Sequence, residues 1–226
     1  MRKLAALLIL LAASAPVAAQ PPAGAPARTL EAIRRDFPLD HQAIAATLAG
    51  KPEAEARRLA YAGIERFLRS RHGAILAAPG PLLVAIEARE GALLRALGGQ
   101  DVRLCATVGD RGFFSREALA GAAPAGLDDY GVALVEAAKA GTGRAPAVPL
   151  ATKEDFLAWL AAVGKIEPGV PVQAMLQDRE LRARSSPDSL CRGAAAMHEA
   201  VAALPPGARE RLARTLLRSV LGSSAP

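Results

Sequence analysis

Reactive side chains are scarce in this chain, which has two cysteines, Cys105 and Cys191, and only three histidines. If the chain is exported, as its N-terminus suggests, two cysteines most simply form one disulfide bond, because extracytoplasmic compartments are oxidising. We therefore predict a Cys105–Cys191 disulfide that joins the middle of the chain to its C-terminal part. The alternatives are two unpaired buried cysteines, or a thiol that binds a metal or acts in catalysis.

Cys191 and His198 resemble a nucleophile and its general base, because seven residues place both on one face of a helix. Seven residues also separate them by roughly 10 Å along the helix, whereas a base must approach its nucleophile to about 3 Å. We therefore exclude a dyad within this helix and expect His198 to be solvated or to cap the helix. His198 and Glu199 begin an H-E-x-x-H zinc motif, but Ala202 stands where its second histidine belongs.

The other two histidines, His41 and His72, have no spacing that predicts a shared metal site with His198. His72 precedes Gly73 and is expected at a helix C-terminus, where a cation is favoured. We therefore predict no metal site and no cofactor.

The carboxylates Glu87 and Glu90 lie in a strongly apolar helical segment. Glu90 is four residues from both Ile86 and Leu94, so it is expected to be partly buried, where a raised pKa would suit general acid–base catalysis. Pairing with an arginine, or exposure at the edge of the apolar stripe, is the commoner outcome. A second carboxylate pair, 128–129, is expected at a helix N-terminus. No nucleotide-binding or serine-hydrolase motif is found, so we name no catalytic residue.

The N-terminus has the pattern of a secretory signal peptide. Arg2 and Lys3 precede a short apolar run, and small residues follow up to Ala19. We predict a signal peptide over residues 1–19, cleaved near Ala19, and hence a periplasmic or secreted protein; the alternative is an uncleaved signal anchor. Residues 20–28 are rich in Pro, Ala and Gly and are predicted to form a disordered leader.

Abundant alanine, a 4% aromatic content and apolar residues at spacings of three and four predict an all-α protein. We expect one helical domain over residues 29–222, an irregular bundle of about eight helices, with a possible subdomain boundary near 141–150. Thr152 followed by Asp155 predicts a capping box. Alternating apolar residues predict a short extended segment near 102–108. Residues 186–221 are expected to form a C-terminal helical hairpin whose two apolar stripes pack together.

Four arginines of the last predicted helix would form a basic outer face: Arg209, Arg211, Arg214 and Arg218. We expect a solvated face, with weak contact to anionic membrane surfaces as the alternative. Without the signal peptide the chain carries 26 basic and 22 acidic residues, a net charge of +4. Its basic residues are dispersed among acidic ones, so nucleic-acid binding is excluded.

The pattern as a whole predicts an exported helical protein of the cell envelope that binds or scaffolds an unknown envelope protein or peptide, rather than an enzyme. Helical arrays offer grooves suited to such ligands. The alternative is an envelope enzyme with a carboxylate-based site, using residues such as Glu90 in a cleft between helices.

Overall fold

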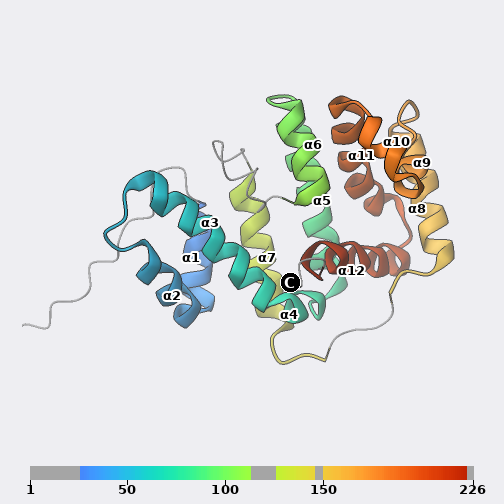
Figure 1. The fold of residues 1–226 in the computed structure, drawn as a ribbon. Helices are drawn as coiled ribbons and strands as arrows, with labels where there is room; N and C mark the ends of the chain where they lie inside the picture. Colours follow the sequence, from blue (N-terminus) through green and yellow to red (C-terminus); the bar gives the residue numbers. More distant parts are fainter. Residues whose placement is uncertain (1–25, 113–125, 146–149, 223–226) are drawn as a thin grey trace, which may run out of the picture.

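The computed structural model describes residues 26–112, 126–145 and 150–222, and no β-strand occurs among them (Figure 1). The predicted all-α class is confirmed, although twelve α-helices and a short 3-10 helix in these ranges exceed the expected eight. The elements are α1 (Ala27–Asp36), α2 (Pro38–Leu48), α3 (Glu53–Ser70), α4 (His72–Leu76), α5 (Gly80–Gly98), α6 (Val102–Arg111), α7 (Leu127–Gly141), α8 (Lys153–Ile166), α9 (Val172–Gln177), α10 (Arg179–Arg184), α11 (Pro187–Glu199), η2 (Ala200–Ala203) and α12 (Pro206–Gly222).

Two predictions concern the N-terminal part of the chain, the signal peptide and the disordered leader. The signal peptide predicted for residues 1–19 lies outside the described residues. Helix α1 begins at Ala27, so the last two residues of the segment expected as a leader are helical. Among the helices that the structure describes, none is both long and apolar enough to cross a membrane.

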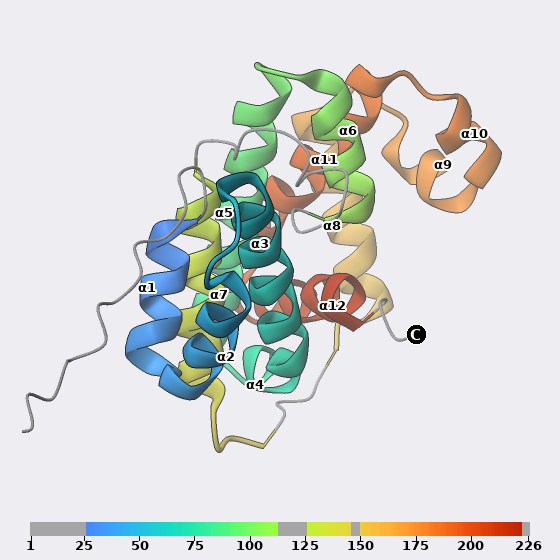
Figure 2. The ribbon, with the colours of Figure 1, turned by 60° about the vertical axis from the view of Figure 1, so that its left-hand side comes forward.

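Helix α5 is the centre of the fold, because α6, α7, α11 and α12 all pack against it. Figures 1 and 2 show α7 on one side of α5, and α6 with α11 on the other. Its residues Leu83, Ile86 and Leu94 are completely buried, as their spacing predicts for an apolar face. The surrounding helices also bury two carboxylates of α5, Glu87 and Glu90.

The acidic residues at the start of α7 attach the first helix of the described chain. Both lie in the first turn of α7, as expected, but the residue that precedes the helix is Gly126. Asp128 accepts hydrogen bonds from the backbone N–H of Thr29 at 3.0 Å and from its hydroxyl at 2.9 Å. Asp129 forms an ion pair with Arg28. These carboxylates thus hold α1 against α7.

The extended segment predicted near 102–108 is wrong, because these residues form helix α6. Asp101 caps it by accepting hydrogen bonds from the amides of Arg103 at 3.0 Å and Leu104 at 2.9 Å, which satisfies two otherwise free N–H groups. Cys105 and Val108 are three residues apart, so they share the buried face of a helix equally well. The apolar residues of this segment are compatible with both the strand period and the helix period, and the cap at Asp101 favours the helix.

The predicted C-terminal hairpin is also wrong in its packing. Helix α11 packs on α5 and α6, whereas α12 runs across the fold and contacts α5 and α4 (Figure 1). The 3-10 turn η2 redirects the chain between them. The apolar stripes of the two helices are therefore buried against α5 rather than against each other.

The basic outer face predicted for α12 does not form, because two of its four arginines are engaged. Arg214 is buried, and its guanidinium donates hydrogen bonds to the carbonyl oxygens of Leu76 at 2.9 Å and Ala78 at 3.3 Å. Arg211 binds both carboxylate oxygens of Asp155 at 2.7 and 2.8 Å. These arginines fasten α12 to α4 and α8.

Candidate functional site

Four polar side chains meet in the core at the centre of the fold. Glu87 and Glu90 lie on one face of α5, Tyr130 comes from α7 and His198 from α11. Their exposed fractions are 1%, 4%, 3% and 9%, respectively. Burying ionisable groups costs free energy unless they are paired. This cluster therefore needs compensating interactions, and it has them.

His198 lies between the two carboxylates. Its Nδ1 is 2.7 Å from Oε2 of Glu87, and its Nε2 is 3.7 Å from Oε1 of Glu90. The hydroxyl of Tyr130 donates a hydrogen bond of 3.0 Å to the other oxygen of Glu90. The remaining oxygen of Glu87, Oε1, is buried and accepts no hydrogen bond from the described residues. Glu87 thus orients the imidazole, and Tyr130 orients Glu90.

The cluster favours a protonated histidine. Burial alone disfavours the imidazolium, but the charges of Glu90 and Glu87 and the hydrogen bond to Glu87 outweigh it and raise the pKa of His198 to about 9. Burial raises the pKa of Glu87 to about 7, although His198 opposes this shift. Burial also raises the pKa of Tyr130 well above its usual range, so it acts as a hydrogen-bond donor at neutral pH.

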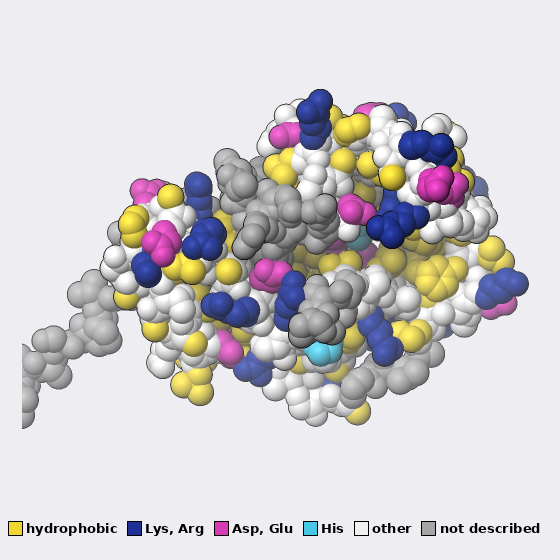
Figure 3. All heavy atoms as spheres, in the orientation of Figure 1, with side chains coloured by type: hydrophobic (Ala, Val, Ile, Leu, Met, Phe, Trp, Pro, Cys, Tyr) yellow, Lys and Arg dark blue, Asp and Glu magenta, His cyan; other side chains and the backbone are white. Residues whose placement is uncertain are grey.

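A cleft of about 330 Å³ reaches this cluster, and Glu90 and His198 line it whereas Glu87 does not. Its other walls are mostly apolar and come from α6, α8, α9, α11 and α12: Val108, Trp159, Leu176, Met197, Leu216 and Val220. Figure 3 shows hydrophobic side chains in a hollow above α12, where this cleft lies. A solvent-connected space therefore reaches His198 and Glu90.

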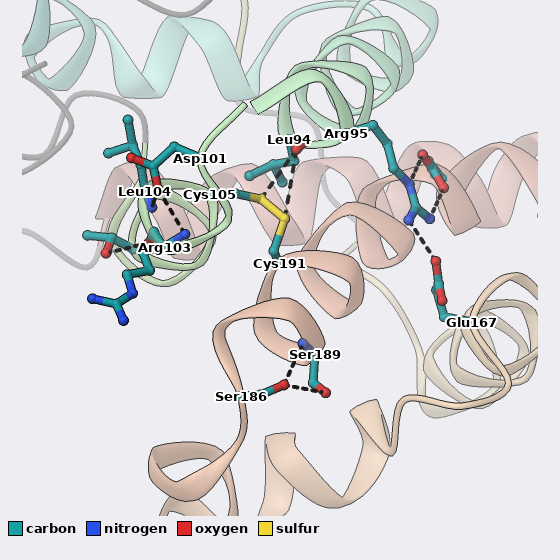
Figure 4. The surroundings of a disulfide bond; sticks show 12 residues. Leu94, Arg95, Asp101, Arg103, Leu104, Cys105, Glu167, Ser186, Ser189 and Cys191 are labelled. Atoms are coloured by element: carbon teal, nitrogen blue, oxygen red, sulfur yellow. Dashed lines mark hydrogen bonds and ion pairs between the residues drawn. A yellow bond between two sulfur atoms is a disulfide. The ribbon is translucent and has the colours of Figure 1, made fainter. Parts of the chain in front are cut away.

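Two further contacts hold the end of α11 that carries His198. The indole N–H of Trp159 donates a hydrogen bond of 2.8 Å to the carbonyl oxygen of Met197. Arg95 of α5 binds both oxygens of Glu199 at 2.8 Å and a carboxylate oxygen of Glu167 at 2.6 Å (Figure 4). The residues on both sides of His198 are therefore fixed, as a site that needs a defined geometry requires.

The cluster also has side-chain atoms that could act as ligands to a small cation. One ligand atom each from Glu87, Glu90 and His198 lie within 4.8 Å of one another. A zinc ion binds nitrogen and oxygen at about 2.0–2.2 Å, so Nε2 of His198 and Oε1 of Glu90 would need only small shifts to share one. Glu87 would then orient the histidine ligand, a common arrangement around metals. This grouping was not predicted from the sequence.

The predicted disulfide between Cys105 and Cys191 is confirmed, and it joins α6 to α11 (Figure 4). Gly98 makes room for it, since a Cβ atom there would lie 2.7 Å from the sulfur of Cys191. The bond engages both thiols, so neither is a nucleophile or a metal ligand. It fastens together two of the helices that line the cleft.

The structure differs from the prediction for His198 and adds a hydrogen-bond partner to the prediction for Glu90. His198 was expected to be solvated or to cap its helix, but it is a buried partner of two carboxylates. Glu90 is more deeply buried than expected, and its hydrogen-bond donor is Tyr130 rather than an arginine. His72 was expected at a helix C-terminus, but it is the first residue of α4, and its Nδ1 lies 2.9 Å from the carbonyl oxygen of Arg69 at the end of α3. Helix-face spacing marked Glu87 and Glu90, but nothing in the sequence linked them to Tyr130 or His198.

Comparisons with protein-family models, curated proteins and solved structures give no match for this chain.

Proposed function

We propose that this protein is an exported enzyme of the cell envelope in which His198 and Glu90 transfer protons to and from a substrate bound in the cleft. The observation that carries the proposal is the buried imidazole of His198, which lies between Glu87 and Glu90 and, together with Glu90, lines the cleft. Ionisable groups with perturbed pKa values that converge on a cleft make that cleft a candidate catalytic site.

Each group has a distinct role in the proposed chemistry. Glu87 holds the ring by accepting the Nδ1–H bond, so Nε2 carries the transferable proton. The protonated His198 donates that proton to a leaving group as a general acid, and the carboxylate of Glu90 accepts a proton from a water or a substrate group. Tyr130 binds the other oxygen of Glu90 and keeps it oriented.

A module that only binds or scaffolds an envelope partner is the second candidate, supported by Leu176 and Val220, which line the cleft and are 49% and 37% exposed. Apolar binding alone does not require three ionisable groups in the core, and apolar side chains of similar volume are often as stable as a buried ion pair. The cluster therefore favours proton transfer. Export itself is supported by the N-terminal pattern and by the disulfide.

The test is a screen of the purified mature protein between pH 5 and 9 with chromogenic esters, phosphate esters, glycosides and peptide anilides. We expect turnover of at least one class, and a decrease of about 100-fold or more in His198→Gln, the scale of general acid–base catalysis. Glu90→Gln, whose amide oxygen still accepts from Tyr130, should also lose activity while it stays folded. His72→Gln is the matched control, because His72 is exposed and outside the cluster.

Two results would overturn the proposal. One is that wild-type protein turns over no substrate class faster than His198→Gln. The other is activity that a chelator abolishes and Zn²⁺ or Mn²⁺ restores, which would make Glu90 and His198 metal ligands rather than proton carriers.

A further inference from the structure

The cleft that reaches His198 continues as a groove along α6 and α11. A narrow apolar crevice of about 60 Å³ shares four residues with the cleft: Gly109, Asp110, Leu176 and Met197. Deeper along α6, it is lined by Ala106, Val172 and Leu190. Such a narrow passage suits a flexible chain rather than a ring.

The other end of the groove is basic. A wider recess of about 520 Å³ shares Ala106, Asp110, Arg182 and Leu190 with the crevice, and it adds two more arginines, Arg103 and Arg179. Among its described lining residues Asp110 is the acidic one, and it lies 3.7 Å from Arg182. The other two arginines are exposed and form no ion pair with any described residue. Figure 4 shows the guanidinium of Arg103 directed away from the disulfide. The recess therefore has positive charge that its described lining residues do not neutralise.

We propose that this groove binds an anionic amphiphile, with its carboxylate or phosphate headgroup at Arg103, Arg179 and Arg182 and its apolar chain running through the crevice into the cleft. Arg103 and Gly109 are six residues apart on α6, which places the headgroup roughly 10 Å from the cleft. Guanidinium groups bind carboxylates and phosphates by charge-assisted hydrogen bonds. The mostly apolar lining of the crevice favours a ligand with an apolar chain over a fully polar one. This proposal rests on the proposed function in one respect only, namely that the amphiphile is also the substrate of the enzyme.

The position of Trp159 provides a direct assay, because it is the single tryptophan of the chain and lines the cleft. We would titrate the protein with decanoate and decyl phosphate below their micelle concentrations and follow tryptophan fluorescence. Saturable binding is expected for both, weaker at high salt because added ions screen the arginines. Decanol and inorganic phosphate each lack half of the ligand and should bind at least about tenfold more weakly.

Variants separate the two ends of the groove. Replacing Arg103, Arg179 and Arg182 together by glutamine should weaken decanoate binding at least about tenfold while leaving decanol unaffected. Leu176→Gln should weaken decanoate and decanol alike. The matched control replaces three exposed arginines elsewhere, Arg58, Arg66 and Arg144, and should bind as wild type.

Failure of this proposal is distinct from failure of the proposed function. The headgroup recess does not include His198, so the arginine triple variant tests binding independently of the proposed proton transfer. No saturable binding, equal binding of decanol and decanoate, or an unchanged affinity in the arginine triple variant would overturn the groove proposal, even if the wild-type protein proves to be an enzyme. If decanoate binds but no substrate class in the screen is turned over, the groove proposal stands and the proposed enzymatic function is wrong.

Discussion

At the scale of single residues, the carboxylate of Glu87 and the imidazole of His198 form a hydrogen bond in the core that makes the folded chain hold protons tightly. Folding raises the pKa of Glu87 from 4.5 to about 7 and that of His198 from 6.5 to about 9. The folded state therefore binds more protons than the unfolded state between pH 4.5 and 9. Stability must fall as pH rises through this window, first through Glu87 and then through His198.

We predict that the free energy of unfolding, measured by urea denaturation, decreases by a few kcal/mol between pH 5 and pH 9, since one pKa unit corresponds to about 1.4 kcal/mol. The double variant Glu87→Gln/His198→Gln should show a much flatter profile, because both titrating groups are gone. His198→Gln alone is not a sufficient test, because Glu87 would still titrate. A double variant with the wild-type slope would show that the cluster does not couple protons to folding.

At the scale of elements, the start of α8 combines a capping box with an ion pair. The hydroxyl of Thr152 accepts from the amide of Asp155 at 3.2 Å, and the carboxylate of Asp155 accepts from the amide of Thr152 at 2.9 Å. This confirms the predicted capping box. Asp155 also binds Arg211 of α12, and hydrogen bonding to Arg211 is the main cause that lowers the pKa of Asp155 to about 2. The carboxylate of Asp155 thus caps the start of α8 and also binds α12 through Arg211.

We predict that Thr152→Ala destabilises the protein by about 1 kcal/mol, the usual cost of a lost cap. Asp155→Asn should cost more, because it also leaves Arg211 without its ionic partner. Since the pKa of Asp155 is lowered, its contribution is present above about pH 4 and is lost as pH falls toward 2. Chemical denaturation at pH 7 and pH 3 measures both effects. Equal stability losses in the two variants at pH 7 would contradict the role given to Arg211.

The same scale shows which elements the sequence predicted well. Helices with regular apolar spacing, such as α5, or with a capping box, such as α8, follow the predicted pattern. Helix α6 does not follow the predicted pattern, because Val102, Leu104, Ala106 and Val108 also fit a strand period. The capping side chain of Asp101 is the signal that favours a helix there. The packing of α11 and α12 also differs from the prediction. Apolar stripes show which face of each helix is buried, but not which neighbour covers it.

At the scale of the whole molecule, the disulfide joins residues 86 positions apart in the sequence. It closes a loop that contains α7 to α10, and so it restricts the unfolded chain strongly. Replacing both cysteines by alanine should lower the free energy of unfolding by about 4 kcal/mol, an upper estimate from chain entropy. Denaturant unfolding of the oxidised, reduced and substituted forms measures this effect.

The substituted and the reduced wild-type proteins should unfold at the same denaturant concentration. A substituted protein that unfolds with the oxidised wild type would show that the bond adds nothing to stability. Because the disulfide joins α6 to α11, we also expect its loss to widen the groove and to weaken decanoate binding.

The sequence by itself determined the helical class, the capping box of α8 and the pairing of the two cysteines. Each of these depends on local spacing, on residue type or on the small number of candidates. Only the tertiary structure decided that Glu87, Glu90, Tyr130 and His198 share one buried site, since they come from three helices and up to 111 positions separate them in the chain. Helix periodicity shows that a side chain faces inward. The packing of α7 and α11 against α5 determines what it meets there.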